Sequence, residues 1–427
     1  MGIDHNKRLK EHLYYYSARI SRDISNLIKW LVFAVITGCI VGAASTLFSF
    51  TLKAVTSYRK AHEWIFLLLP LSGLVIVFLY EKLGKEDGGT NQVLSTVRSR
   101  DDVPILSAPL IFITTALTHL TGGSAGREGA AIQLGGSIAN QLGRWIHLDE
   151  EDRHVIVMCG MSAAFSALFG TPMAAAVFAM EVVSVGVMYY AALLPCVIAA
   201  IIAAEFATGM GIDPETFPVH SIPGLTVETG LKMTLIAVGC GILSILFCIL
   251  LKIVGQLYTK YLKNPYIRIV VAAGVIILLT ICLNTKDYMG AGSGLIARAI
   301  EKGEARPLDF LWKMLLTALT MRAGYRGGEI VPAFSVGATF GCVAGGILGF
   351  SPELAAAASM VALFCGVTNC PITAMLISFE LFGFSGAAYY LIAISISYAV
   401  SGYYSLYKDQ TIVYSKYKAR YINRKTR

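Results

Sequence analysis

The sequence predicts an all-α, polytopic membrane protein built as two repeats with broken, re-entrant helices. Of its 427 residues, 56% are hydrophobic and only 15% are charged, against roughly 25% charged in a typical soluble domain. The apolar residues form continuous runs rather than the alternating pattern of a membrane β-barrel. The chain also repeats itself at a distance of about 200 residues. These observations exclude a disordered chain and argue strongly against an ordinary soluble enzyme.

Basic residues are concentrated at the two ends of the chain. The net charge is +8; residues 1–30 hold six basic and three acidic side chains, and residues 405–427 hold seven basic and one acidic. Because basic segments beside membrane spans tend to stay in the cytoplasm, we expect both termini to be cytoplasmic and the protein to lie in the cell membrane. Residues 4–25 mix tyrosines and Ile20 with charged residues, which is typical of an amphipathic helix on a membrane surface.

Long apolar runs follow this first segment, and several are short or interrupted by glycine. They lie near residues 27–55, 64–81, 104–120, 155–183, 186–208, 231–256, 267–283, 308–320, 333–349, 355–380 and 384–404. Helices that stop part-way are tolerated only where their ends face protein or a water-filled site. We therefore divide the chain into a cytoplasmic amphipathic helix (1–28), two membrane repeats (29–212 and 213–408) and a short basic cytoplasmic tail (409–427).

The internal repeat keeps its order over four segments. At a shift of 201 residues, the positions of Gly126 and Glu128 coincide with Gly327 and Glu329, and at 199 the position of Glu181 coincides with Glu380. Each of the last two follows a proline by nine residues, a paired placement that favours a scaffold role. Duplicated membrane domains usually carry their substrate sites at the junction of the halves, on the ends of discontinuous helices. Function is therefore expected at the glycine-flanked helix starts.

Three such helix starts can bind an anion. Glycine-rich stretches at 122–129, 324–332 and 88–91 precede apolar helical segments. Sharp glycine turns leave backbone N–H groups free at the start of the next helix, and these groups and the helix dipole attract anions without a full positive charge. Glu128 is a carboxylate beside such a start. It could be a tethered anion that leaves when protonated, or a cap that only stabilises the helix, and the residues alone leave both readings open.

Five short motifs, in order along the chain, resemble those of the CLC family of chloride channels and transporters. Residues 126–129 (Gly-Arg-Glu-Gly) resemble the family's G-R-E-G-P stretch, and 327–332 are similar to its G-x-F-x-P stretch. Segments 170–181 and 370–373 resemble two further proline motifs, and 403–405 resemble the tyrosine region of the last helix. The likeness runs from about residue 30 to 415. Each motif alone is weak, whereas five in order make a strong match.

The resemblance implies a homodimer of inverted two-half subunits, with one anion pathway in each subunit. Glu128 matches the gating glutamate, and Arg127 is expected to act mainly as a clamp on backbone or carboxylate. The residues that the resemblance and the helix starts place at the anion site are Thr90, Asn91, Gly126, Arg127, Gly129, Gly328, Ile330, Val331 and Tyr403 or Tyr404. Of the two tyrosines we favour Tyr403.

Departures from the family pattern resemble its fluoride/proton antiporter branch. Chloride/proton exchangers carry adjacent glutamates at the inner proton site, whereas this chain has Glu181 followed by Val182. Glu329 adds a second carboxylate beside the path, in a Gly-Gly-Glu motif like that of the fluoride branch. Fluoride is small and strongly hydrated, so a site must replace its water with strong donors. We expect fluoride export driven by proton entry, with Glu128 and Glu329 as the gating and proton-transfer residues.

Other functions have less support. A chloride-transporting exchanger or a passive anion channel of the same family remains the alternative, because both also carry the gating glutamate. A membrane enzyme would need a nucleophile with its base, and a cation transporter would need acidic residues facing carbonyl ends. We expect no metal, no cofactor, no nucleic-acid partner and no cytoplasmic nucleotide-sensing (CBS) domains. His119, within an apolar run, is expected to be a satisfied core histidine.

Overall fold

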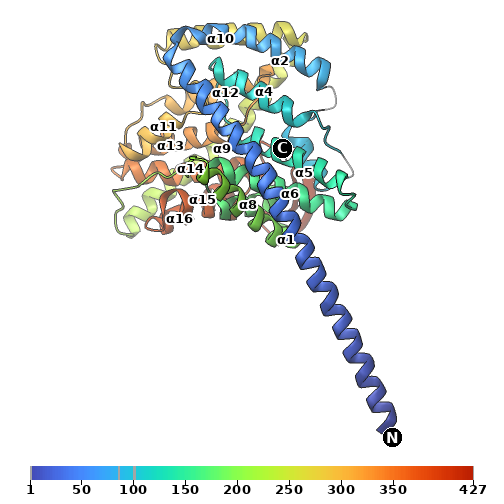
Figure 1. Ribbon diagram of the computed structural model, residues 1–427. Helices are drawn as coiled ribbons and strands as arrows, with labels where there is room; N and C mark the ends of the chain where they lie inside the picture. The colour runs from blue at the N-terminus through green and yellow to red at the C-terminus, as the bar shows by residue number, and fades with distance from the viewer. Residues whose placement is uncertain (1, 85–86, 100–101, 427) are drawn as a thin grey trace.

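The computed structural model describes residues 2–84, 87–99 and 102–426. Its helices fall into two sets that follow the predicted repeat (Figure 1). The first set is α1 (Gly2–Ala61), η1 (Glu63–Leu68), α2 (Leu69–Leu83), α3 (Thr90–Thr96), α4 (Ser107–Leu120), α5 (Glu128–Trp145), α6 (Glu150–Phe169), α7 (Pro172–Glu181), η2 (Tyr190–Ala192) and α8 (Leu193–Gly209). The second set is α9 (Val227–Tyr261), α10 (Pro265–Cys282), α11 (Ser293–Glu301), α12 (Asp309–Ala323), α13 (Ile330–Ile347), α14 (Pro352–Thr368), α15 (Pro371–Phe382) and α16 (Ala387–Val400).

Equivalent helices of the two sets pack in the same way. α5 lies along α6 as α13 lies along α14, and α1 packs on α8 as α9 packs on α16. The helix ends also correspond: α6 is capped by Gly170, with φ +69°, and α14 by Asn369, with φ +60°. Both residues adopt the left-handed conformation that stops a helix, and a proline then opens α7 and α15. The duplication is therefore one of backbone conformation as well as of sequence.

Six helical segments of the described residues are long and apolar enough to cross a membrane. They are Tyr14–Ala61, Glu63–Leu83, Tyr190–Gly209, Val227–Tyr261, Pro265–Cys282 and Ile330–Ile347. Other apolar helices, such as α7 and α15, have only 10–17 residues. At 1.5 Å per residue they fall short of a hydrocarbon layer about 30 Å thick. The predicted all-α membrane fold with broken helices is confirmed.

The centre of the molecule is made by α6 and α14. From residue 156 to 169 in α6 and from 354 to 368 in α14, every side chain is buried. Their partners α5 and α13 approach closely because glycines face the contact. Gly135 meets Gly160 backbone to backbone, and Gly337 lies against Met360. Small residues of this kind let helices approach closely in a membrane, where lipid offers no hydrophobic force.

The two ends of the chain differ from the sequence expectation. α1 is one continuous helix of 60 residues, so the predicted amphipathic helix 1–28 is not separate from the first span. Residues 3–37 contain neither glycine nor proline, and nothing stops the helix there. Its N-terminal part extends away from the bundle (Figure 1).

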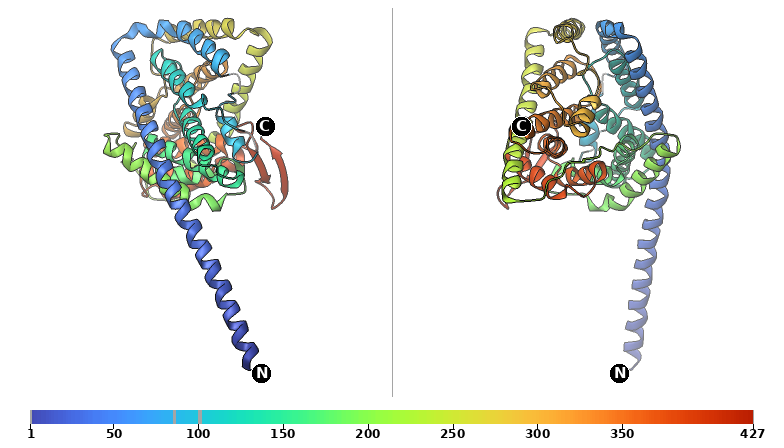
Figure 2. Two further views of the ribbon diagram at one scale, coloured as in Figure 1. Left: turned by 45° about the vertical axis from the view of Figure 1, so that its right-hand side comes forward. Right: turned by 90° about the vertical axis from the view of Figure 1, so that its left-hand side faces the viewer.

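The tail 409–427 also contains structure that the sequence did not predict. β2 (Thr411–Tyr414) pairs in parallel with β1 (Ser184–Val185) and antiparallel with β3 (Tyr421–Lys425). The red strands lie at one edge of the molecule in Figure 2. Gln410, fully buried just before β2, donates to the carbonyls of Val182 (2.9 Å) and Thr368 (2.7 Å). The tail is thereby fastened to both halves.

Candidate functional site at the junction of the two halves

The starts of α5 and α13 are joined by a backbone bridge between the two repeats. The N–H of Gly126 donates to the carbonyl of Gly328 at 2.7 Å, and the N–H of Gly328 donates back to the carbonyl of Gly126 at 2.9 Å. A side chain on Gly328 would lie 2.6 Å from the backbone nitrogen of Gly129. Glycine is required here because the two backbones touch. The repeat-related helix starts therefore meet, as their sequences predicted.

Glu128 is the first residue of α5 and is fully buried. Its Oε2 accepts from the backbone N–H of Arg127 (3.0 Å) and from the backbone N–H of Val331 on α13 (3.3 Å). Among the described residues, its Oε1 accepts no hydrogen bond. An ordinary capping carboxylate bonds within its own helix, whereas this one reaches an N–H of the other half. The geometry thus favours the tethered-anion reading of Glu128.

The third predicted helix start lies beside the other two. Gly89, with φ +71°, precedes α3, and Thr90 Oγ1 donates to the carbonyl of Gly129 at 3.0 Å. Asn91 Oδ1 is buried and has no hydrogen-bond partner among the described residues. Ile330, at the start of α13, is also buried. The structure therefore brings the three predicted helix starts into one neighbourhood.

Glu329 lies just before α13, and its side chain is 23% exposed. Its Oε1 is 3.9 Å from Nη2 of Arg322 on α12. Arg326, in the glycine-rich stretch before it, places its guanidinium 3.6 Å from the ring centre of Tyr80. Glu329 is thus less deeply buried than Glu128, and its nearest basic partner, Arg322, is too distant for a hydrogen bond.

We expected Tyr403 at the anion site; the contacts that the structure shows for its side chain are with the tail. Its hydroxyl bonds Ser415 in the tail at 2.8 Å, and the Arg424 guanidinium stacks 4.0 Å from its ring centre. Tyr404 is partly buried against apolar side chains of α9, α10 and α12. Within the described part of the chain, neither tyrosine hydroxyl bonds Glu128.

A third tyrosine, Tyr407, which the sequence analysis did not single out, lies near the two carboxylates. It is 5% exposed and lies within electrostatic range of both Glu128 and Glu329. The sequence offers only a weak indication of this residue, because Tyr407 is a third tyrosine on the irregular segment after α16.

Arg127 and His119 take the supporting roles expected of them. Arg127 Nη2 pairs with Glu215 and lies 3.4 Å from the carbonyl of Leu168, so it clamps both carboxylate and backbone. His119 is 4% exposed, and its Nε2 lies 3.2 Å from the carbonyl of Gly126. It is a satisfied core histidine beside the bridge. Glu205, for comparison, is exposed on α8.

Glu181 and Glu380 each hold the start of the other half's helix. Glu181, at the end of α7, accepts from Thr373 N (2.8 Å) and Thr373 Oγ1 (2.6 Å) and from Ile372 N (3.1 Å), all at the start of α15. Glu380, near the end of α15, accepts from the N–H groups of Met173 and Ala174 at the start of α7, both at 2.9 Å. The paired scaffold role predicted from the repeat is confirmed.

A cavity of about 680 Å³ opens beside Arg127. Basic side chains outnumber acidic ones in its wall: Lys53, Arg59, Lys60, Arg127, Lys286 and Arg298 face Glu63, Glu215 and Asp287. Such a surplus attracts anions toward the site by focusing the field within a cleft.

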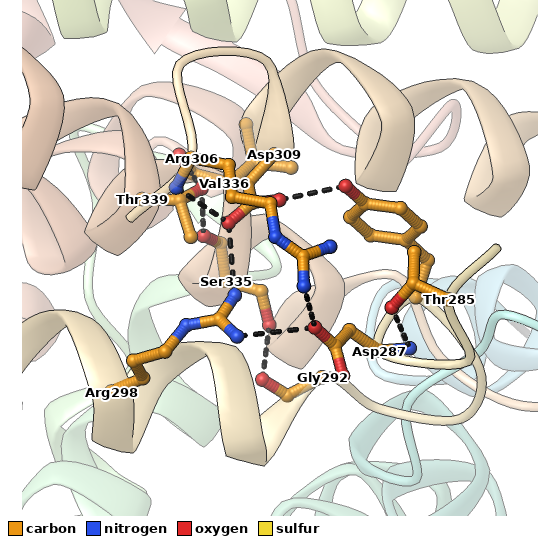
Figure 3. Close-up of polar contacts among 10 residues, drawn as sticks. Thr285, Asp287, Gly292, Arg298, Arg306, Asp309, Ser335, Val336 and Thr339 are labelled. Carbon is orange, nitrogen blue, oxygen red and sulfur yellow. Dashed lines mark hydrogen bonds and ion pairs between the residues drawn. The ribbon is translucent and has the colours of Figure 1, made fainter. Parts of the chain in front are cut away.

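A polar network braces the wall of this cavity that belongs to the second half (Figure 3). Arg298 on α11 pairs with Asp287 (3.1 Å) and Asp309 (3.0 Å). The Tyr288 hydroxyl donates to Asp309 at 2.7 Å. Burial, followed by this hydrogen bond, raises the pKa of Tyr288 above its usual value, so the phenol stays protonated and keeps donating. The network fixes the loop that leads into α11.

The chain is similar to known anion channels and transporters over most of its length. A family model described as "Voltage gated chloride channel" matches residues 72–402. A "Chloride/fluoride channel protein" of Pseudomonas syringae pv. tomato is 33% identical over 402 residues, covering 92% of this chain and 88% of the relative. An "H(+)/Cl(-) exchange transporter ClcA" of Vibrio cholerae is 28% identical over 60% of this chain and 58% of its own.

Solved structures agree with these relatives. The crystal structure of a CLC-type fluoride/proton antiporter superposes with a TM-score of 0.86 at 32% identity, covering 90% of this chain and 98% of that one. A slow cyanobacterial Cl-/H+ antiporter superposes with a TM-score of 0.77 at 16% identity, covering 87% of this chain and 94% of that one, which shows the shared fold alone. With its paired helix starts, its buried Glu128 and these likenesses, the chain belongs to the CLC family of voltage-gated chloride channels and related transporters.

Proposed function

We propose that the protein is a secondary active antiporter that exports fluoride from the cell in exchange for protons. One observation carries the mechanism: Glu128 Oε2 accepts hydrogen bonds from N–H groups at both helix starts. An ionised carboxylate on these donors occupies the place that a transported anion needs. When Glu128 takes up a proton, its attraction to the donors falls and the carboxyl can leave. An anion then replaces it, so anion and proton movements are coupled.

Fluoride is the proposed cargo on two grounds. The relative with 33% identity is named for chloride and fluoride, and the structure with 32% identity is of a fluoride/proton antiporter. The site also offers backbone N–H groups and the Thr90 hydroxyl, which are small donors able to approach a small ion. Glu329, as a second carboxylate, would donate a hydrogen bond when protonated and repel anions when charged. Tyr407 would be the tyrosine of the site, in place of Tyr403 or Tyr404.

The proposed setting is the cell membrane, with both termini cytoplasmic and two copies of the chain in a homodimer. Lys29 at the base of the first span pairs with Asp152 at the start of α6, which supports placing this end of the bundle at one membrane surface. The opposite end of α1 borders the basic cavity, which would then open to the outside.

Transport by purified protein in liposomes tests the proposal. Fluoride and chloride efflux would be recorded with ion-selective electrodes while a pH electrode records proton uptake. We expect fluoride efflux to exceed chloride efflux and to drive proton entry, and we expect Glu128→Gln and Glu329→Gln each to reduce the coupled proton flux. Glu205→Gln, at an exposed position on α8, is the matched control.

Three results would overturn this function. Proton-coupled fluoride efflux that is unchanged in both Glu128→Gln and Glu329→Gln would remove the assigned carboxylates from the mechanism. Anion flux whose reversal potential ignores an imposed proton gradient would identify a passive channel, and chloride flux equal to fluoride flux would identify a chloride-transporting exchanger.

A further inference from the structure

Arg127 lies between two carboxylates of different exposure. Its Nη2 pairs with Glu215 Oε1, and its Nε lies 3.8 Å from Glu128 Oε1. The Arg127 side chain is 15% exposed and that of Glu215 is 30% exposed, whereas Glu128 is fully buried. Glu128 Oε1 has no hydrogen-bond partner among the described residues. One guanidinium thus has a close partner on one side and a vacant carboxylate oxygen within reach on the other.

Glu215 lies on the segment that joins the two halves, between α8 and α9. The backbone N–H of Glu215 donates to the carbonyl of Phe169 at 3.0 Å, at the end of α6. Pro214 packs on the next residue, Gly170, where a Cβ would lie 2.6 Å from the Pro214 Cα. Arg127 and Glu215 both line the basic cavity. The carboxylate is therefore held at the cavity wall by backbone contacts.

We propose that Glu215 is a positioning residue that holds the Arg127 guanidinium away from Glu128 and so keeps Glu128 able to take up a proton. An opposite charge at close range favours the ionised carboxylate. If Arg127 moved onto the vacant Oε1, it would make a second, charge-assisted contact with ionised Glu128. Protonation would then need a higher proton concentration. This inference rests on the proposed function only in giving Glu128 protonation a role in anion flux.

Other charged and titratable groups also lie near Glu128, and Lys313 and His119 among them have partners of their own. Lys313 on α12 directs its Nζ to Ser124 Oγ (2.9 Å) and to the carbonyls of Tyr288 (3.0 Å) and Gly290 (2.6 Å). His119 lies against the carbonyl of Gly126. Tyr407, from the segment after α16, interacts electrostatically with Glu128 and with Glu329, which lies beside the start of α13.

Arg59 on α1 faces His119 and Lys313 rather than Glu128, and it donates to the His119 carbonyl. Lys313 also interacts electrostatically with Glu128, but its Nζ is held by the three hydrogen bonds given above. Arg127 is the basic side chain that lies between Glu128 and Glu215.

The test is the pH dependence of anion flux in liposomes. Glu215→Gln is expected to move the pH of half-maximal fluoride flux by about one unit to the acid side, the lower end of the effect of an adjacent opposite charge. Glu63→Gln is the matched control, because Glu63 lines the same cavity and pairs with Lys286 at 2.9 Å. Its profile should stay at the wild-type position. A Glu215→Gln profile at the wild-type position, or moved to the alkaline side, would overturn the inference.

A double substitution separates positioning from a direct charge effect. In an Arg127→Gln background, adding Glu215→Gln should move the profile by much less than in the wild type. An equal movement in both backgrounds would show that Glu215 acts on Glu128 without Arg127. If Glu215→Gln does not fold, Glu215→Asp gives the same information, because its shorter side chain should produce a smaller acid shift, and a wild-type profile would contradict the inference. The readout needs anion flux alone, so absent proton coupling in the wild type would refute the antiporter and leave this test intact.

Discussion

The Glu181→Ala substitution removes a carboxylate by which the first half holds the second. Glu181 is 6% exposed and accepts three hydrogen bonds at the start of α15. A hydrogen bond to a charged group contributes about 1.5–3 kcal/mol, and buried donors left without a partner carry a further cost. Because the three donors share one carboxylate, their contributions do not add fully. We therefore expect a loss of about 3–5 kcal/mol in the free energy of unfolding.

The partner substitution, Glu380→Ala, provides an internal scale. Glu380 is half-buried and accepts two backbone hydrogen bonds, and water can reach the N–H groups that it would leave. We therefore expect Glu380→Ala to lower the free energy of unfolding by about half as much as Glu181→Ala. With about 1–2 °C per kcal/mol for a chain of this length, the melting temperature should fall by about 3–10 °C for Glu181→Ala and about 1.5–5 °C for Glu380→Ala.

Thermal unfolding of the purified protein in detergent, followed by intrinsic fluorescence, measures both changes. Glu205→Ala, on the exposed face of α8, is the control and should leave the melting temperature within about 1 °C of the wild type. A Glu181→Ala protein that melts with this control would refute the reasoning. A larger loss for Glu380→Ala than for Glu181→Ala would refute the part that depends on burial.

Three further substitutions probe the site and its supports. Gly328→Ala places a Cβ 2.6 Å from the backbone nitrogen of Gly129 and should abolish anion flux in liposomes, whereas Gly346→Ala, with nothing within 4 Å, should leave flux unchanged. Lys313→Met leaves two buried carbonyls without a donor, and its melting temperature should fall by an amount equivalent to about 2–4 kcal/mol. Gln410→Leu removes the tail's bonds to both halves; hydrogen exchange of the β2 amides should then be faster, and unchanged protection would contradict the anchoring role.

Much of the site was predictable because its parts are helix starts, which short stretches of sequence determine. The glycines around Glu128 and Glu329 mark helix starts wherever they fold, and the repeat indicated that two of these starts correspond. The equivalence of Glu181 and Glu380 likewise followed from the distance of each to a proline. Such features depend on backbone conformation within a few residues, which sequence patterns report well.

Other features depend on where the chain goes after a helix ends. Residues 401–410 are irregular, so spacing alone could not show that the Tyr403 hydroxyl bonds Ser415 in the tail. β1 has two residues, lies between α7 and η2, and pairs with a tail more than half the chain away. Glu215 became a candidate only when folding placed it beside Arg127. Contacts between distant segments of this kind leave no local signature.

The Gly126–Gly328 bridge means that main-chain atoms set the distance between the starts of α5 and α13. Both bridge residues are glycines, and their two hydrogen bonds of 2.7 and 2.9 Å hold the two segments together. Substitutions at Glu128 or Glu329 can therefore alter which charge is present there while the spacing of the two helix starts stays the same. A shift in preference between small and large halides would require changes that move α5 relative to α13, and such changes lie in the packing of whole helices.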